Sequence, residues 1–191
     1  MSTITILGTG NMGPAIAGIV EKGGHTAELL GSNATDAPFT GDIVILAVPY
    51  SAVDQILTER GDQLAGKVVV DVTNPLNFET FDSLTVPADS SAAARIAAAL
   101  PQSWVLKAFN TNFAATLASG VVGEQPTTVL IAGDDADAKG LLAEVVSSAG
   151  LRAIDAGTLR RARELEALGF LQISLAASEK IAWTGGFAVQ V

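Results

Sequence analysis

The chain has 191 residues, a formal net charge of −9, one histidine and no cysteine. This length suits one well-buried domain or a domain with a small appendage, and the acidic balance argues against a nucleic-acid partner. Disulfides, thiolate chemistry and a histidine-rich metal centre are excluded. Because no apolar run reaches about 20 residues and no basic leader precedes the first strand pattern, we expect a metal-free cytoplasmic protein without a membrane segment.

Strand-like and helical patterns alternate along the chain. Strands are predicted at 3–7, 27–30, 43–48, 68–72, 105–109, 128–132 and 152–155, and helices at 14–22, 51–64, 90–100, 114–119, 136–149 and 159–181. Several strands are continuous β-branched runs, as expected for strands buried on both faces. The alternation predicts an α/β fold, a Rossmann-type doubly wound parallel sheet over 1–157, with a small helical extension at 158–191.

The connection between the second and third predicted strands is unusual. Residues 31–42 are rich in turn formers and show no helical period, although a parallel crossover usually contains a helix. We therefore predict a bare loop there, and a second loop over 77–89. Helix ends are also marked: Asp89 or Ser90 is expected to cap one helix and Asp135 the next.

A glycine motif follows the first predicted strand directly. Gly8, Gly10 and Gly13 form Gly-x-Gly-x-x-Gly between an apolar strand and a helical pattern. In this motif the first glycine permits a tight turn, the second lets backbone approach a pyrophosphate, and the third lets helix pack on strand. Phosphates are favoured at the helix N-terminus that follows. The motif favours dinucleotide binding over a purely structural turn.

Three further strand ends carry candidate site residues, because ligands of a doubly wound sheet bind beyond the carboxyl ends of its strands. These ends are Val48-Pro49-Tyr50, Thr73-Asn74-Pro75-Leu76 and residues 107–111. Pro49 and Pro75 could shape a slot for a nicotinamide ring, or they could simply end their strands.

For the other polar and aromatic candidates, a structural role is an alternative to a functional one. Lys107 could face the cleft, act as a cap or lie in solvent, and Asn110 and Thr111 could bond a ligand or their own loop. His25 is expected to make a local hydrogen bond rather than act in catalysis. Trp183, with Phe187 beyond it, is expected to belong to the core rather than to a stacking platform.

Several motifs, in order along nearly the whole chain, resemble those of coenzyme-F420-dependent NADP reductases. They are Gly-Thr-Gly-Asn-Met-Gly at 8–13, Ala-Val-Pro-Tyr at 47–50, Asp-Val-Thr-Asn-Pro-Leu at 71–76, Lys-Ala-Phe-Asn-Thr at 107–111, Asp-Ala-Gly-x-Leu at 155–159 and Arg-Glu-Leu-Glu-x-Leu at 163–168. The wider group includes the cytosolic domain of membrane ferric reductases. The resemblance implies NADP(H) in a Rossmann cleft, a small helical C-terminal part and homodimers.

The resemblance also implies roles for individual residues. Residues 9–13 would hold the pyrophosphate and Ser32 would touch the adenosine phosphate, while Tyr50, Leu76 and Ala114 would line the nicotinamide side. The candidate cofactor-binding residues are Gly8, Thr9, Gly10, Asn11, Met12, Gly13, Ser32, Asn33, Val48, Pro49, Tyr50, Asn74, Pro75, Leu76 and Ala114. We name no catalytic residue and no metal ligand.

The chain departs from the family pattern after the second strand. Relatives usually carry Gly-Ser-Arg and a helix with further basic residues, whereas this chain has Gly31-Ser32-Asn33-Ala34. Ser32 lies about 20 residues past the glycine motif, where NAD enzymes often place an acid. The absence of an acid, apart from the later Asp36, favours NADP. The absence of the arginine should weaken that preference, because a charge-assisted phosphate contact is lost.

We therefore expect an enzyme that transfers a hydride between NADP(H) and a small-molecule acceptor, either a deazaflavin (F420) or a flavin-like compound. Such a reaction needs two rings held together and no protein nucleophile, which fits a sequence without an acid–base pair. The alternatives are a non-catalytic NADP(H)-binding redox sensor or assembly protein, and a ferric-chelate or flavin reductase. An enzyme for imines or 2-hydroxy acids is disfavoured because those enzymes add a larger helical domain.

The last predicted helix suggests assembly. Its apolar residues, mostly three and four positions apart, are Leu165, Leu168, Leu171, Leu175 and Ala176. One face must therefore be buried, and the wider stripe around 169–173 predicts a two-fold dimer, with packing on its own sheet as the alternative. The arginines and glutamates at 160–166 are expected on a solvated face, or to receive an anionic substrate tail.

Overall fold

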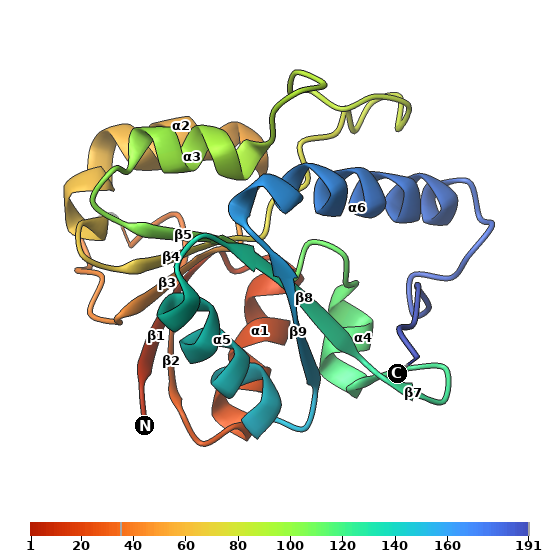
Figure 1. Cartoon of the computed structure of the whole chain (residues 1–191), viewed down its shortest axis with the longest axis horizontal. Coiled ribbons are helices and arrows are strands. Elements are labelled where there is room, and N and C mark those ends of the chain that lie inside the picture. Colours follow the sequence, from red (N-terminus) through yellow and green to blue (C-terminus); the bar gives the residue numbers. More distant parts are fainter. Residues whose placement is uncertain (35, 191) are drawn as a thin grey trace.

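The computed structural model describes residues 1–34 and 36–190, so Thr35 of the predicted loop and Val191 of the predicted extension lie outside it. Its central sheet has the strand order β2-β1-β3-β4-β5-β8-β9 (Figure 1). The bounds are β1 Thr3–Leu7, β2 Thr26–Leu30, β3 Ile43–Leu46, β4 Val68–Asp71, β5 Trp104–Lys107, β8 Thr128–Gly133 and β9 Arg152–Gly157. Neighbouring strands pair in parallel except β5 with β8, which pair antiparallel. The predicted doubly wound fold is confirmed, with a mostly rather than wholly parallel sheet.

Helices cover both faces of the sheet (Figure 1). One face carries α1 Met12–Lys22, α4 Ala114–Ser119 and α5 Ala136–Ser148; the other carries α2 Tyr50–Arg60, α3 Ala92–Ala99 and α6 Ala162–Ala177. Short 3-10 turns, η1 Gly61–Leu64 and η2 Leu159–Arg161, follow α2 and precede α6. Among the described residues, no helix is both long enough and apolar enough to cross a membrane.

The core forms two layers because the inner strands are apolar on both faces. In β3, Ile43 and Ile45 pack into the layer with α1 and α5, and Val44 and Leu46 pack into the layer with α2 and α3. All four residues are buried. The continuous apolar runs of the sequence therefore form strands that are buried on both faces, as predicted.

The connection from β2 to β3 is a bare loop in its described part, as predicted. Phe39 is only 5% exposed and packs into the layer beneath α2. The Phe39 N–H donates to Gln63 Oε1 (3.2 Å), and Lys67 Nζ donates to the Gly41 carbonyl (2.8 Å). One aromatic side chain and its anchors thus take the place of a crossover helix.

Several predicted bounds need correction. Ser91, rather than Asp89 or Ser90, caps α3 through the N–H of Ala94, since its backbone is the extended residue before the helix. Asp135 caps α5 as predicted. The last helix, predicted at 159–181, runs from Ala162 to Ala177, because residues 159–161 form a 3-10 turn and Glu179 has a left-handed φ of 59°. The strands β6 Val121–Val122 and β7 Gln125–Pro126 form a small hairpin that the pattern did not indicate.

Candidate functional site

The glycine turn joins β1 to α1 and is shaped by backbone contacts. Gly8 has φ +116°, and a side chain there would overlap the carbonyl oxygen of Ala47. A side chain at Gly13 would overlap the carbonyl oxygen of Gly8, so this glycine lets α1 pack on the strand end. A Cβ at Gly10 would meet nothing within 4 Å. The middle glycine therefore faces open space, and the other two are needed by the fold itself.

Two hollows meet at this turn. The larger one, the main cleft, has a volume of about 1120 Å³, and the smaller one, the side hollow, has about 400 Å³. Both are lined by Thr9, Gly10, Ala47, Val48 and Pro49, which follow β1 and β3. In the order 2-1-3-4-5, the gap between β1 and β3 is the switch point where doubly wound folds bind nucleotides. The hollows lie at that point.

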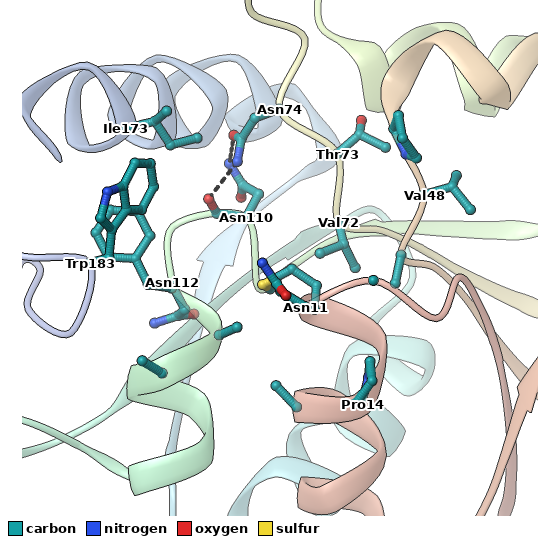
Figure 2. A pocket seen from close by; sticks show the side chains of 18 of the residues that line it. Asn11, Pro14, Val48, Val72, Thr73, Asn74, Asn110, Asn112, Ile173 and Trp183 are labelled. Carbon is teal, nitrogen blue, oxygen red and sulfur yellow. Dashed lines mark hydrogen bonds between the residues drawn. The ribbon is translucent and has the colours of Figure 1, made fainter. Parts of the chain in front are cut away.

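The main cleft is closed by parts of the chain that are far apart in sequence. Besides the glycine turn, its lining comes from the ends of β3 and β4, the segment that leads into α4, and Ile173 and Trp183. Figure 2 shows Ile173 and Trp183 on the opposite side from Val48. The Trp183 ring lies 4.9 Å from that of Phe113, at 54°. The C-terminal segment thus contributes an aromatic wall.

Asparagines form the polar part of the cleft lining (Figure 2). Asn110 Nδ2 donates to Asn74 Oδ1 (3.0 Å) and to the Leu165 carbonyl (2.9 Å), and Asn112 Nδ2 donates to the Thr128 carbonyl (3.0 Å). The buried oxygens Asn110 Oδ1, Asn112 Oδ1 and Thr73 Oγ1 have no hydrogen-bond partner among the described residues. Asn110 stabilises its loop, as one of the two predictions for it stated.

Charged side chains are absent from the described lining of the main cleft, where Tyr50 is the sole titratable residue. Burial raises the pKa of Tyr50 above its ordinary value, and Arg95 opposes that shift. Arg95 Nη1 donates to the Tyr50 hydroxyl oxygen (3.0 Å). Tyr50 therefore stays neutral near pH 7, and the cleft offers apolar and neutral polar surface without an acid–base pair.

A buried ion cluster lies beneath the strand ends. Lys107 Nζ is 2.8 Å from Asp71 Oδ2 and 2.9 Å from Glu166 Oε1, and the three side chains are at most 1% exposed. Lys107 also donates to the Thr73 carbonyl (2.6 Å). Burial raises the pKa of Glu166, while Lys107 and the Ala92 N–H at the start of α3 lower it. The cluster joins β4, β5, α3 and α6.

This cluster corrects two sequence predictions. Lys107 neither faces the cleft nor lies in solvent, and Glu166 is not on a solvated helix face. The reason lies in the tertiary structure. Asp71 and Lys107 are register partners at the ends of two buried strands, and Glu166 lies on the buried stripe of α6, next to Leu165. The arginines at 160, 161 and 163 are exposed, as expected.

The side hollow lies between the β2–β3 loop and α2. Its lining includes Thr9, Ser32 and Ala34 on one side and Glu59 and Arg60 on the other. Arg60 is half-buried, and burial lowers its pKa, although a guanidinium remains protonated near neutral pH. Sequence reasoning did not single out this residue, because it ends an ordinary helix far from any motif.

The structure brings most of the predicted site residues together. The hollows are lined by Gly8, Thr9, Gly10, Asn11, Met12, Ser32, Val48, Pro49, Tyr50, Asn74 and Ala114. Four others, Gly13, Asn33, Pro75 and Leu76, lie outside both linings. Residues that the sequence did not indicate also line the main cleft: Phe78, Asn112, Phe113 and Ile173. Whether any of them contacts a cofactor stays a prediction.

The predictions for Trp183, Phe187 and His25 can also be compared with the structure. Trp183 and Phe187 are 52% and 46% exposed, so the prediction that they are core residues was wrong. Both residues follow α6, which ends at Ala177, so they are not part of the buried face of that helix. His25 makes hydrogen-bond contacts, but they are long-range rather than local as predicted: its Nδ1 accepts from the Ser2 N–H (3.2 Å), and its Nε2 lies 3.4 Å from Ser148 Oγ.

Comparison with known proteins agrees with this geometry. The family described as "NADP oxidoreductase coenzyme F420-dependent" matches residues 19–75. The chain is 31% identical to an F420-dependent NADP reductase of Methanocaldococcus jannaschii over 171 residues, 87% of this chain and 76% of that protein. It is also 38% identical to the rat Metalloreductase STEAP3 over 135 residues, 71% of this chain but 26% of that protein.

A solved structure is similar over the full length. The crystal structure of a proposed F420-dependent NADP-reductase from Arthrobacter sp. FB24 superposes with a TM-score of 0.85 at 25% identity, covering 100% of both chains. These relatives are reductases and give no support to a non-catalytic redox sensor or assembly protein. The similarity to the Methanocaldococcus jannaschii reductase, 31% identity over most of both chains, is sufficient to show a shared family. The glycine turn and the main cleft also lie where such a fold binds nucleotides. This chain belongs to the F420-dependent NADP reductase family of NADP-dependent oxidoreductases.

Proposed function

We propose that this protein transfers a hydride between NADP(H) and a deazaflavin of the F420 type, or a flavin-like acceptor, in the main cleft. The observation that carries the proposal is the lining itself. It holds apolar side chains, uncharged asparagines and one neutral tyrosine, without a charged group among the described residues. Direct hydride transfer requires no protein acid, base or nucleophile, so such a lining is sufficient.

The residues fit an NADP(H) molecule that spans the two hollows. The open face of Gly10 and the N-terminus of α1 suit a pyrophosphate, and Thr9 and Ser32 line the side hollow where an adenosine phosphate would lie. Asn110 and Asn112 line the main cleft, where the carboxamide of the nicotinamide would lie. When bound, NADPH supplies the hydride. The chain contributes orientation and the exclusion of water by Val48, Phe113 and Trp183.

We also propose that residues 158–191 act as an extension that completes the cleft of the dinucleotide-binding domain, 1–157. Ile173 on α6 and Trp183 beyond it line the main cleft, opposite the glycine turn. Buried Gln172 ties this extension to the domain, since its Nε2 donates to the Thr111 carbonyl (3.1 Å). The extension would then face the hydride acceptor.

The proposal is tested by mixing the protein anaerobically with NADPH and, in separate reactions, F420, a flavin or a ferric chelate. The absorbance of reduced nicotinamide reports its oxidation. We expect consumption with F420 or flavin at rates that saturate with acceptor concentration. Absence of oxidation with every acceptor, in a protein that binds NADPH, would contradict the assignment, and oxidation with the ferric chelate alone would favour a ferric reductase.

Ser32 is expected to determine part of the cofactor preference. Ser32→Asp should weaken NADPH binding and reduce the discrimination against NADH, because a carboxylate repels a phosphate and accepts from a ribose hydroxyl. Asn33→Arg should instead tighten NADPH binding by about 1.5–3 kcal/mol, since it adds a charge-assisted contact with the phosphate. Calorimetric titration of both variants with both dinucleotides measures the effect. A preference for NADH in the unmutated protein would overturn the NADP(H) assignment.

We propose that the protein is a homodimer. Helix α6 buries Leu165 and Ala176 against its own subunit, yet Leu171 remains 50% exposed, as do large parts of Trp183 and Phe187. A second subunit related by a two-fold axis would cover such a surface. Light scattering at micromolar concentration, with and without NADPH, should give the mass of two chains. A single-chain mass under both conditions would rule the dimer out.

A further inference from the structure

Arg60 is the one cation in the described lining of the side hollow. It is the last residue of α2, and it lines the hollow together with Ser32 of the β2–β3 loop. In the described part of the chain, no carboxylate forms an ion pair with its guanidinium. A half-buried positive charge without a carboxylate partner, at the edge of a hollow, is available to a bound anion.

Contacts with neutral groups fix the guanidinium in place. Its Cζ lies 3.7 Å from the centroid of the Phe39 ring. Nη1 donates to the Ala34 carbonyl (3.3 Å) and Nη2 donates to the Ala37 carbonyl, while Nε is buried without a partner. Because these partners carry no charge, they orient the planar group without neutralising it.

The acids near Arg60 are exposed. Asp36 raises its pKa through its charge but makes no ion pair with it. Glu59, also in the hollow lining, accepts from Gln55 Nε2 (2.8 Å) and is exposed. A protein with a formal net charge of −9 must bind a phosphate through local cations and N–H groups, and Arg60 is the cation that shares the described lining of this hollow with Ser32.

We propose that Arg60 makes the protein prefer NADP(H) over NAD(H), by supplying the positive charge for the adenosine 2′-phosphate. It takes the place of the arginine that this chain lacks at Asn33. The inference rests on the proposed function, because it assumes that a dinucleotide occupies the two hollows. The bare loop is part of the arrangement, since its Ala34 and Ala37 carbonyls hold the guanidinium at the hollow.

The test compares calorimetric affinities for NADPH, NADH and adenosine 2′,5′-bisphosphate. Arg60→Gln should weaken NADPH and bisphosphate binding about 10- to 100-fold and leave NADH within about threefold, because only the phosphate contact is charge-assisted. The salt dependence of NADPH binding should also fall. Adding Asn33→Arg to Arg60→Gln should restore most of the NADPH affinity. Arg60→Lys should have an intermediate NADPH affinity, because lysine keeps the positive charge but cannot donate two parallel hydrogen bonds from a planar group.

Lys67→Gln is the matched control. Lys67 anchors the same loop through the Gly41 carbonyl and carries the same charge, but it lies outside both hollows. It should leave the NADPH-to-NADH affinity ratio unchanged. Equal loss of NADPH and NADH affinity in Arg60→Gln, or no loss of either, would overturn the role of Arg60. An unmutated protein that binds neither dinucleotide would overturn the proposed function instead, so the two failures are distinguishable.

Discussion

Lys107→Met is expected to destabilise the protein by about 3–5 kcal/mol, the cost of leaving buried charges without their partner. The change would leave Asp71 and Glu166, both at most 1% exposed, as two carboxylates without a cation. A loss of this size is a large part of the about 5–15 kcal/mol that keeps a domain folded. Urea denaturation followed by circular dichroism measures the change.

The loss should depend on pH. Burial raises the pKa of Glu166 above its ordinary value, and without Lys107 the lowering influence of that cation disappears. A carboxylate with a raised pKa in the folded state binds a proton that the unfolded state has released, so stability falls as pH rises through that interval. The variant should therefore be closer to the unmutated protein at about pH 5 than at about pH 8.

Lys139→Met is the control for Lys107→Met, because Lys139 pairs at 2.7 Å with an Asp155 side chain that is 60% exposed. That variant should lose at most about 1 kcal/mol. Should Lys107→Met fail to fold, Lys107→Met with Glu166→Gln removes one of the two unpaired carboxylates and should recover part of the stability. Equal, small losses in both lysine variants would contradict a structural role for the buried cluster.

Gly10→Ala is expected to weaken NADPH binding about 100-fold and to leave stability unchanged. Its methyl group would meet no protein atom within 4 Å, so the fold has no reason to change. The methyl would instead occupy the space where we expect backbone and pyrophosphate to meet, and the loss of a hydrogen bond to a charged group there costs about 1.5–3 kcal/mol, or about 10- to 150-fold in affinity. Calorimetry and thermal unfolding together separate the two effects.

The matched variant is Gly140→Ala on α5, where the added methyl also meets nothing within 4 Å and lies outside both hollows. Its NADPH affinity should equal that of the unmutated protein. If Gly10→Ala also binds NADPH with unchanged affinity while remaining folded, this turn does not hold the cofactor. Both variants replace glycine with alanine, so an effect of the added methyl group that does not depend on its position would appear in both.

The order and type of the elements could be predicted from the sequence because their signals are local. Buried β-branched runs such as 43–46, and the Asp135 cap of α5, depend only on neighbouring residues. The reversed direction of β8 could not be predicted in this way. It pairs antiparallel with β5 at Leu106 and Lys107, and that pairing is a long-range contact with no periodic signal.

The candidate site likewise contains residues that could be predicted from local sequence and residues that could not. The glycine turn and the strand ends at Val48–Tyr50 were predicted because the motif and its context are contiguous. Arg60 and Trp183 were missed as site residues, since they reach the hollows through tertiary packing from a helix end and a C-terminal segment. Lys107 was misplaced for a similar reason. Its burial depends on Asp71 and Glu166, which come from two other elements.

Transfer of an isotopic label tests the central claim most directly. The protein is mixed with NADPH that carries deuterium at carbon 4 of the nicotinamide ring, on each face in turn, together with oxidised F420 or a flavin. The reduced acceptor is then analysed by mass spectrometry. Direct transfer in a water-excluding cleft predicts that the label from one face appears in reduced F420, whose carbon acceptor retains it. Reduced F420 that carries only solvent hydrogen, whichever face is labelled, would contradict direct hydride transfer in this cleft.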